Sequence, residues 1–117
     1  DFRAPLPLCR ALDEAVRAAL RPHALAFSHL SHFDAADACL YVTFAGSGGG
    51  ERHARAWHAA ISAGAAAGAT VNHHHGIGLG KLSWIQNAWD APRLSAWRDE
   101  KFARDPHGLL NPGKICP

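Results

Sequence analysis

The sequence predicts an α+β fold, namely a ferredoxin-like antiparallel sheet with helices on one face, followed by C-terminal helices. Three observations carry this prediction: apolar residues at helical spacing in two segments, a period-two separation of side chains over residues 38–45, and the element order helix, strand, strand, helix, strand. At 117 residues the chain is large enough for one small domain with a single core. We expect the first strand of the βαββαβ order to be missing.

The first half of the chain contains the first helix and a hairpin. Leu12, Val16 and Leu20 recur at helical spacing, which predicts a helix over residues 7–21. Strands are expected over residues 24–33 and 38–45, joined by the polar turn 34–37. Alternation in the second strand separates a core face from an open face. The core face is expected to hold Ala38, Leu40, Val42 and Phe44, and the other face Cys39, Tyr41 and Thr43.

The second half begins with a glycine-rich loop over residues 46–50. An alanine-rich helix should follow over residues 51–68, with Trp57, Ile61 and Ala65 on its inner stripe, and then a short strand over residues 70–72. Leu82, Ile85 and Trp89 align on a further helix. Asp90 and Pro92 favour the start of a last helix that runs to residue 104, and the tail 105–114 consists of turn residues.

Composition and charge exclude several classes of protein. The net charge is only +2 and the arginines are dispersed, which argues against nucleic acid as a partner. No apolar run approaches the ~20 residues that span a bilayer. The three cysteines, Cys9, Cys39 and Cys116, suggest neither a disulfide framework nor a zinc site, and reduced thiols favour the cytoplasm. Because methionine is absent even at the first position, we expect a fragment of a larger protein.

The most informative motif is a run of three histidines, His73, His74 and His75, that leads into the glycine-rich segment 76–81. Imidazoles titrate near neutrality and glycines allow close approach of the backbone, so the segment suits proton transfer. A catalytic cluster, a metal site and an incidental polar turn all remain open. On an extended strand, His74 would point away from the other two, which argues against one metal bound by all three. A P-loop is rejected, because Leu82 occupies the Ser/Thr position.

The only tyrosine of the chain, Tyr41, falls on the face of its strand that does not face the core. It is therefore either a half-buried strand aromatic or a residue of a site. His29 and His32 on the preceding strand have the same two interpretations.

Three segments together resemble a known family. They are residues 31–45 with the motif Ala38-Cys39-Leu40-Tyr41, residues 62–80 with the triple histidine, and residues 105–114, which end in Asn111-Pro112-Gly113-Lys114. This combination resembles the C-terminal part of FAD-linked oxidases of the vanillyl-alcohol oxidase superfamily, most closely the alkyldihydroxyacetonephosphate synthase branch. The resemblance spans about residues 8–115.

The resemblance implies a two-part enzyme. An upstream domain would bind most of the FAD, and residues 1–117 would form the cap that faces a small oxygenated substrate, with residues 105–117 as a closing tail. His73, His74, His75 and Tyr41 would then be the catalytic residues for proton transfer. His75, Asn111 and Lys114 would contact the cofactor, and the arrangement is compatible with a homodimer.

The sequence also departs from a related branch. Glycolate and D-2-hydroxy acid dehydrogenases carry Glu-His-Gly-Ile-Gly and two strand histidines that help bind a divalent metal. Here His74 replaces the glutamate and Cys39 replaces the second histidine, which leaves only His32, so we expect no such metal site. Two alternatives remain open: an FAD-dependent D-2-hydroxy acid dehydrogenase, and a stand-alone metal-binding ferredoxin-like module.

Overall fold

The computed structural model describes residues 1–114, so Cys116 and the end of the predicted closing tail lie outside the described residues. The chain forms two compact units, Asp1–His75 and Gly76–Pro117. Each unit is described by itself.

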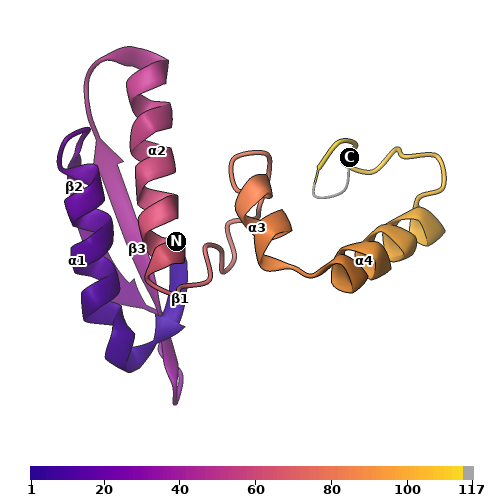
Figure 1. Ribbon diagram of the computed structural model, residues 1–117, viewed down its shortest axis with the longest axis horizontal. Coiled ribbons are helices and arrows are strands. Elements are labelled where there is room, and N and C mark those ends of the chain that lie inside the picture. The colour runs from indigo at the N-terminus through magenta and orange to yellow at the C-terminus, as the bar shows by residue number, and fades with distance from the viewer. Residues whose placement is uncertain (115–117) are drawn as a thin grey trace. The chain divides into compact units, whose positions relative to one another are not determined.

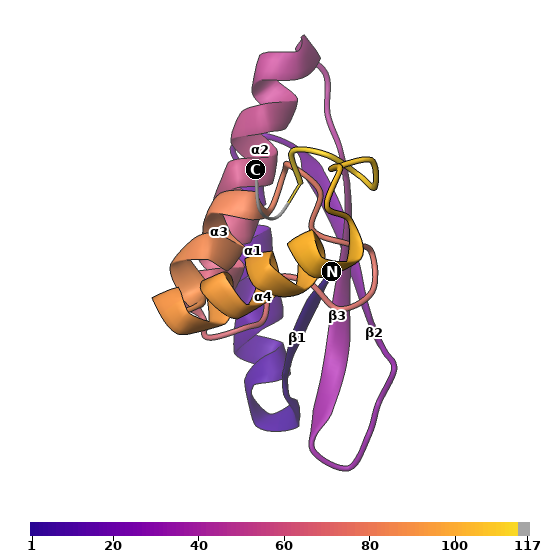
Figure 2. The ribbon, with the colours of Figure 1, turned by 90° about the vertical axis from the view of Figure 1, so that its right-hand side faces the viewer.

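The first unit is built on a three-stranded antiparallel sheet. Its elements are β1 (Phe2–Pro5), a 3-10 turn (Leu6–Leu8), α1 (Cys9–Leu20), β2 (Leu25–Ser31), β3 (Asp37–Ala45) and α2 (Gly49–Ala66). The strand order is β1-β3-β2, and both helices cover the same face of the sheet (Figures 1 and 2). The α+β, ferredoxin-like prediction is therefore confirmed.

The prediction that the first strand is missing is wrong. β1 pairs with β3 from Phe2 opposite Leu40 to Pro5 opposite Asp37. The sequence pattern did not predict this strand, because it has only four residues and ends in proline, which is unusual within a sheet. The expected strand over residues 70–72 is reduced to one antiparallel bridge between Arg3 and Thr70. That bridge lies beside β1, where the fourth strand of a ferredoxin-like sheet belongs.

The core lies between the sheet and the two helices. Ala38 and Leu40 are buried on the predicted core face of β3. The predicted inner stripe of α2 is wrong, because Ala65 is exposed and Trp57 is only half-buried. Small residues with one isoleucine form the buried stripe instead: Ala56, Ala60, Ile61 and Gly64. Small side chains let α2 approach β1 so closely that the ring of Phe2 occupies the place of a side chain at Gly64.

The opposite face of the sheet, here called the open face, is covered by neither helix of the first unit (Figures 1 and 2). Its residues include Leu25, Phe27, His29, Tyr41 and Thr43, and the side chains of Leu25 and Phe27 are 65% and 63% exposed. Cys39 lies on this face but is buried, because the guanidinium of Arg3 covers it with Nη1 3.7 Å from Sγ. Arg3 is held there by ion pairs to Asp34 and Asp37.

The second unit contains α3 (Leu82–Ala88) and α4 (Ala91–Arg104). The predicted start of α4 is confirmed, since the carboxylate of Asp90 accepts a hydrogen bond of 2.8 Å from the backbone N–H of Arg93. The tail folds back onto Asp105, whose two carboxylate oxygens accept from the N–H groups of Leu109 and Leu110, each at 2.8 Å. Over residues 1–114, no helix has both the length and the apolar character to cross a membrane.

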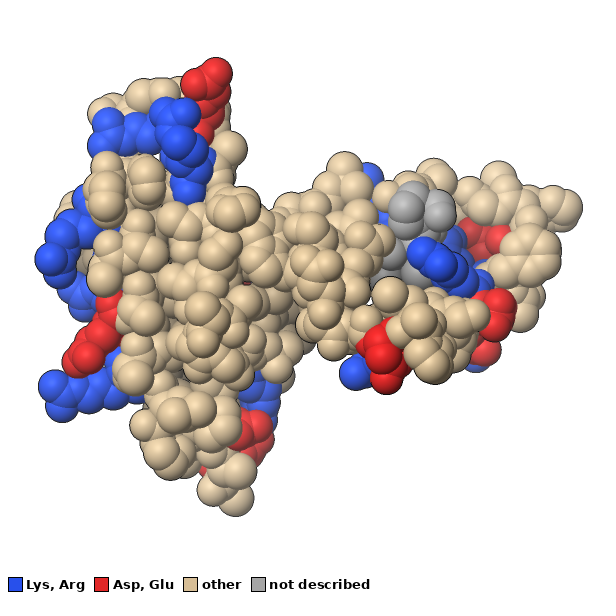
Figure 3. Space-filling model, in the orientation of Figure 1, with Lys and Arg blue, Asp and Glu red and all other residues tan. Residues whose placement is uncertain are grey.

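Charged side chains on the helices of the first unit are paired locally. Arg10 and Glu14 lie 2.9 Å apart on α1, and Arg55 and Glu51 lie 3.5 Å apart on α2. On the side of the molecule shown in Figure 3, basic side chains of this unit stand beside acidic ones instead of forming one wide basic area. The absence of a nucleic-acid partner stays a prediction.

Candidate active site

The structure brings the four predicted catalytic residues together beside the open face. The phenol oxygen of Tyr41 lies 3.0 Å from Nε2 of His74. The ring of His75 lies edge-on to that of Tyr41 at 5.6 Å, and the rings of His73 and His74 are 4.9 Å apart. With His29 and His32 these residues form what we call the histidine–tyrosine cluster.

The β2–β3 hairpin supplies three members of the cluster. His29 on β2 is the register partner of Tyr41 on β3, and the two rings stack at 4.9 Å with an interplanar angle of 7°. His32 follows the last residue of β2 and has a left-handed backbone with φ 50°. Its Nδ1 lies 3.1 Å from the phenol oxygen. The sequence left the roles of both histidines open, and the geometry includes both in the cluster.

The triple histidine is a bend and not an extended strand, so the predicted alternation of its side chains is wrong. All three rings come close to Tyr41 or His32. The His73 and His32 rings are 5.9 Å apart, and the His74 and His32 rings are 4.9 Å apart.

Sequence reasoning missed the residue that holds this bend. Asp1 has a side chain that is 0% exposed, and its Oδ2 accepts hydrogen bonds from the backbone N–H groups of His73 at 2.9 Å and His74 at 3.2 Å. Its other oxygen lies 3.4 Å from Nδ1 of His75. Asp1 is separated from these histidines by more than 70 residues and belongs to no motif, so no local signal identifies it.

Burial and neighbouring charges set the protonation of the cluster. Desolvation, and then the nearby His75, His32 and His73, lower the pKa of His74 from its ordinary value of 6.5. Desolvation also raises the pKa of Tyr41, with a smaller contribution from Cys39. At neutral pH the cluster therefore presents a neutral imidazole and a protonated phenol in hydrogen-bond distance, a pairing suited to acid–base chemistry.

The remaining predicted residues belong to the second unit. Asn111 is exposed and has a left-handed backbone with φ 49°, whereas Lys114 is half-buried. Their contact with a cofactor stays a prediction. Within residues 1–114, no three side chains among His, Cys, Asp and Glu are placed to hold a metal ion together.

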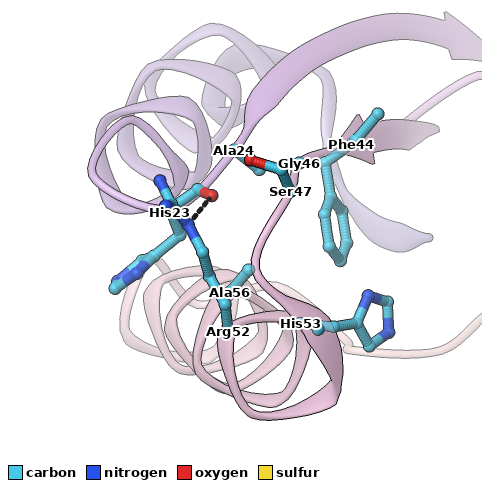
Figure 4. Close-up of a pocket in the computed structure, with 10 residues that line it drawn as sticks. His23, Ala24, Phe44, Gly46, Ser47, Arg52, His53 and Ala56 are labelled. Atoms are coloured by element: carbon cyan, nitrogen blue, oxygen red, sulfur yellow. Dashed lines mark hydrogen bonds between the residues drawn. The ribbon is translucent and has the colours of Figure 1, made fainter.

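A separate pocket of about 230 Å³ lies at the N-terminal end of α2 (Figure 4). Arg52 closes one side by donating a hydrogen bond of 2.8 Å to the backbone oxygen of His23. His53 stacks on Phe44 at 5.4 Å. None of the predicted site residues lines this pocket.

Comparison with known proteins agrees with the resemblance seen in the sequence. Over 93 residues the chain is 30% identical to an alkyldihydroxyacetonephosphate synthase of Trypanosoma brucei brucei. The aligned segment covers 76% of this chain and 15% of that protein. Over 46 residues it is 41% identical to a D-2-hydroxyglutarate dehydrogenase of Xanthomonas citri pv. viticola. This second alignment covers 39% of this chain and 10% of that protein.

The chain thus spans a small part of the length of these relatives, and no solved structure matches it. The family model described as "FAD linked oxidases, C-terminal domain" matches residues 1–115. The chain therefore belongs to the family of FAD-linked oxidases and contains sequence of their C-terminal domain.

Proposed function

We propose that this chain is the cap of an FAD-dependent oxidoreductase, in which the open face covers the flavin and the histidine–tyrosine cluster transfers protons to and from a small oxygenated substrate. The observation that carries the proposal is the 3.0 Å approach of the Tyr41 phenol to Nε2 of His74, beside a sheet face that neither helix of the first unit covers.

The residues of the open face fit a flavin. An isoalloxazine is flat and aromatic, and the open face offers the exposed side chains of Leu25 and Phe27 beside the stacked rings of His29 and Tyr41. Because the chain covers only 15% and 10% of its relatives, we assign most FAD binding to a domain outside these 117 residues. The flavin would supply the redox or adduct chemistry. The two described cysteines are free, which supports a reducing, cytoplasm-like compartment as part of the proposal.

The cluster has the groups that such a reaction requires from the protein. His74 is a base because its lowered pKa keeps it neutral, and His75 beside it is a second candidate for removing the substrate proton. Tyr41 keeps its proton and can donate a hydrogen bond to the reacting oxygen. A correctly placed general base typically contributes about 10²- to 10⁴-fold in rate.

Two reactions fit this cluster. Chemistry like that of the alkyldihydroxyacetonephosphate synthases is favoured by the match over 76% of the chain and by the pairing of Tyr41 with the triple histidine. Oxidation of a D-2-hydroxy acid is the second candidate, because of the higher identity to a D-2-hydroxyglutarate dehydrogenase over a shorter segment. Anaerobic bleaching of the flavin by D-2-hydroxyglutarate, D-lactate or glycolate would favour oxidation, whereas the synthase-type exchange gives no net reduction.

The proposal is tested in the protein that includes its FAD-binding domain. His75→Ala and Tyr41→Phe should abolish most turnover while the FAD content stays at the wild-type level. His58→Ala, on the exposed side of α2, is the matched control and should turn over normally. Wild-type turnover in the Tyr41 and His75 variants would refute the role of the cluster.

A further inference from the structure

The phenol oxygen of Tyr41 lies between two imidazoles. Nδ1 of His32 is 3.1 Å away on one side, and Nε2 of His74 is 3.0 Å away on the other, with Nδ1 of the same ring at 3.3 Å. A phenol has one proton to donate and can accept through its lone pairs. Only one imidazole can therefore receive its proton, and the other must donate an N–H to the oxygen.

The surroundings favour His74 as the acceptor. His74 lies among His73, His75 and His32, and its desolvation with these neighbours lowers its pKa, so its ring is neutral at neutral pH and can accept the phenol proton. His32 is exposed at the end of β2, where water can return a proton to its ring. With His74 as the acceptor, the phenol O–H donates to Nε2 of His74, and Nδ1–H of His32 donates to the phenol oxygen.

The backbone at His32 supports a specific role for this imidazole. Its φ of 50° is a left-handed conformation that glycine or asparagine adopts more readily than histidine. The following turn fixes that conformation, because the carboxylate of Asp34 accepts hydrogen bonds from Ala36 and Asp37 at 2.8 Å and pairs with Arg3. With this backbone conformation, Nδ1 of the His32 ring lies against the phenol oxygen.

We propose that His32, Tyr41 and His74 form a proton relay, with His32 as the positioning residue that connects the phenol to solvent. The phenol proton forms the new N–H bond at Nε2 of His74, while the N–H bond at Nδ1 of a protonated His32 breaks and re-forms the O–H of Tyr41. One positive charge moves from His32 to His74 and no electrons are transferred. The use of this relay in turnover rests on the proposed function, but its existence does not.

Other ionisable groups also face the relay. His29 stacks on Tyr41, and the thiol of Cys39 raises the pKa of the phenol. His73 and His75 flank His74, and the carboxylate of Asp1 holds the backbone of the bend. Among these groups, His75 and His73 contribute to the lowered pKa of His74, and Cys39 contributes to the raised pKa of Tyr41.

The relay is tested first in the 117-residue chain, without flavin, by nitrogen-15 NMR of labelled histidines above their pKa values. We expect both neutral rings to carry their proton on Nδ1, because His32 donates from that atom and His74 accepts at Nε2. Tyr41→Phe removes only the hydroxyl, and both rings should then lose this preference. His29→Ala removes the stacking partner and should leave both tautomers unchanged.

Two results would overturn the relay: an unprotonated Nδ1 on neutral His32, or His32 and His74 tautomers that Tyr41→Phe leaves unchanged. The variant His32→Gly distinguishes loss of the imidazole from a folding defect. Glycine fits the left-handed backbone, so this variant should unfold at or above the wild-type temperature. In that variant the pKa of His74 should rise, since a neighbouring charge that lowers it is gone.

The role in turnover is tested separately, in the protein that includes its FAD-binding domain. There, His32→Gly should slow turnover and change its pH profile while FAD stays bound. An unchanged pH profile would overturn the role of His32 in turnover. If the expected tautomers are found but both Tyr41→Phe and His75→Ala turn over at the wild-type rate, the relay is supported and only the proposed function is refuted.

Discussion

Replacing Gly64 by alanine should destabilise the first unit and disturb the cluster. A Cβ at this position would lie 2.1 Å from Cε1 of the Phe2 ring. Favourable carbon–carbon contact begins near 3.5 Å, so the ring would have to move by about 1.4 Å. Such overpacking of a filled core typically costs about 1–3 kcal/mol. For a unit of this size, that lowers the unfolding temperature by roughly 4–8 °C per kcal/mol, measured by circular dichroism.

The same helix provides a matched control. A Cβ at Gly50 meets no atom within 4 Å, so Gly50→Ala should stabilise α2 by about 0.5–1 kcal/mol. Phe2 is the neighbour of Asp1, which holds the histidine bend, so Gly64→Ala should also shift the imidazole NMR signals of His73 and His74. The reasoning fails if Gly64→Ala unfolds at the wild-type temperature with unchanged histidine signals.

Three further predictions concern stability. Asp90→Ala removes the N-terminal cap of α4 and should reduce its helicity, at a cost of about 1 kcal/mol, as measured by circular dichroism against Asp99→Ala as control. His74 has a lowered pKa in the folded chain, so the unfolded chain binds its proton more tightly and the free energy of unfolding should fall as pH drops below 6.5. Denaturant titrations at several pH values should show a smaller fall in His74→Gln than in the wild type. Hydrogen bonds from Leu110, then Lys101 and Leu109, lower the pKa of Asp105. Their stabilisation is present above pH 3.8 and should be lost as pH falls through the lowered value, which should appear as lower amide protection in the tail relative to the intrinsic exchange rate at each pH.

Local patterns predicted the helices that have a strong contrast between their faces. The first helix was expected over residues 7–21 and is observed as Cys9–Leu20, because Leu12, Val16 and Leu20 stand out against charged neighbours. The last helix starts where the capping carboxylate of Asp90 predicted. In both cases the determining interactions lie within a few residues of one another, so the sequence alone contains them.

The inner face of α2 could not be predicted in this way. Alanine and glycine recur throughout the helix, so several stripes have nearly equal apolar character. The choice depends on which stripe is small enough to admit Phe2, and that ring comes from a strand the pattern did not reveal. A four-residue strand such as β1 has too few alternating positions to be recognised without its partner β3.

In the site, too, the residues of local motifs could be predicted, whereas a contact between distant segments could not. The motif identified Tyr41 and the triple histidine because both lie in short segments with unusual composition. It could not identify Asp1, because Asp1 and the histidine bend lie at opposite ends of the sequence of the first unit. The motif also predicted alternating directions for three side chains whose backbone Asp1 instead holds in a bend. Since the imidazoles gather near the phenol through this carboxylate, Asp1→Ala should disperse them even though the motif itself is intact. The chemistry of the cluster thus depends on a residue outside every motif, and a search by motif alone would recover the reactive groups but not what holds them together.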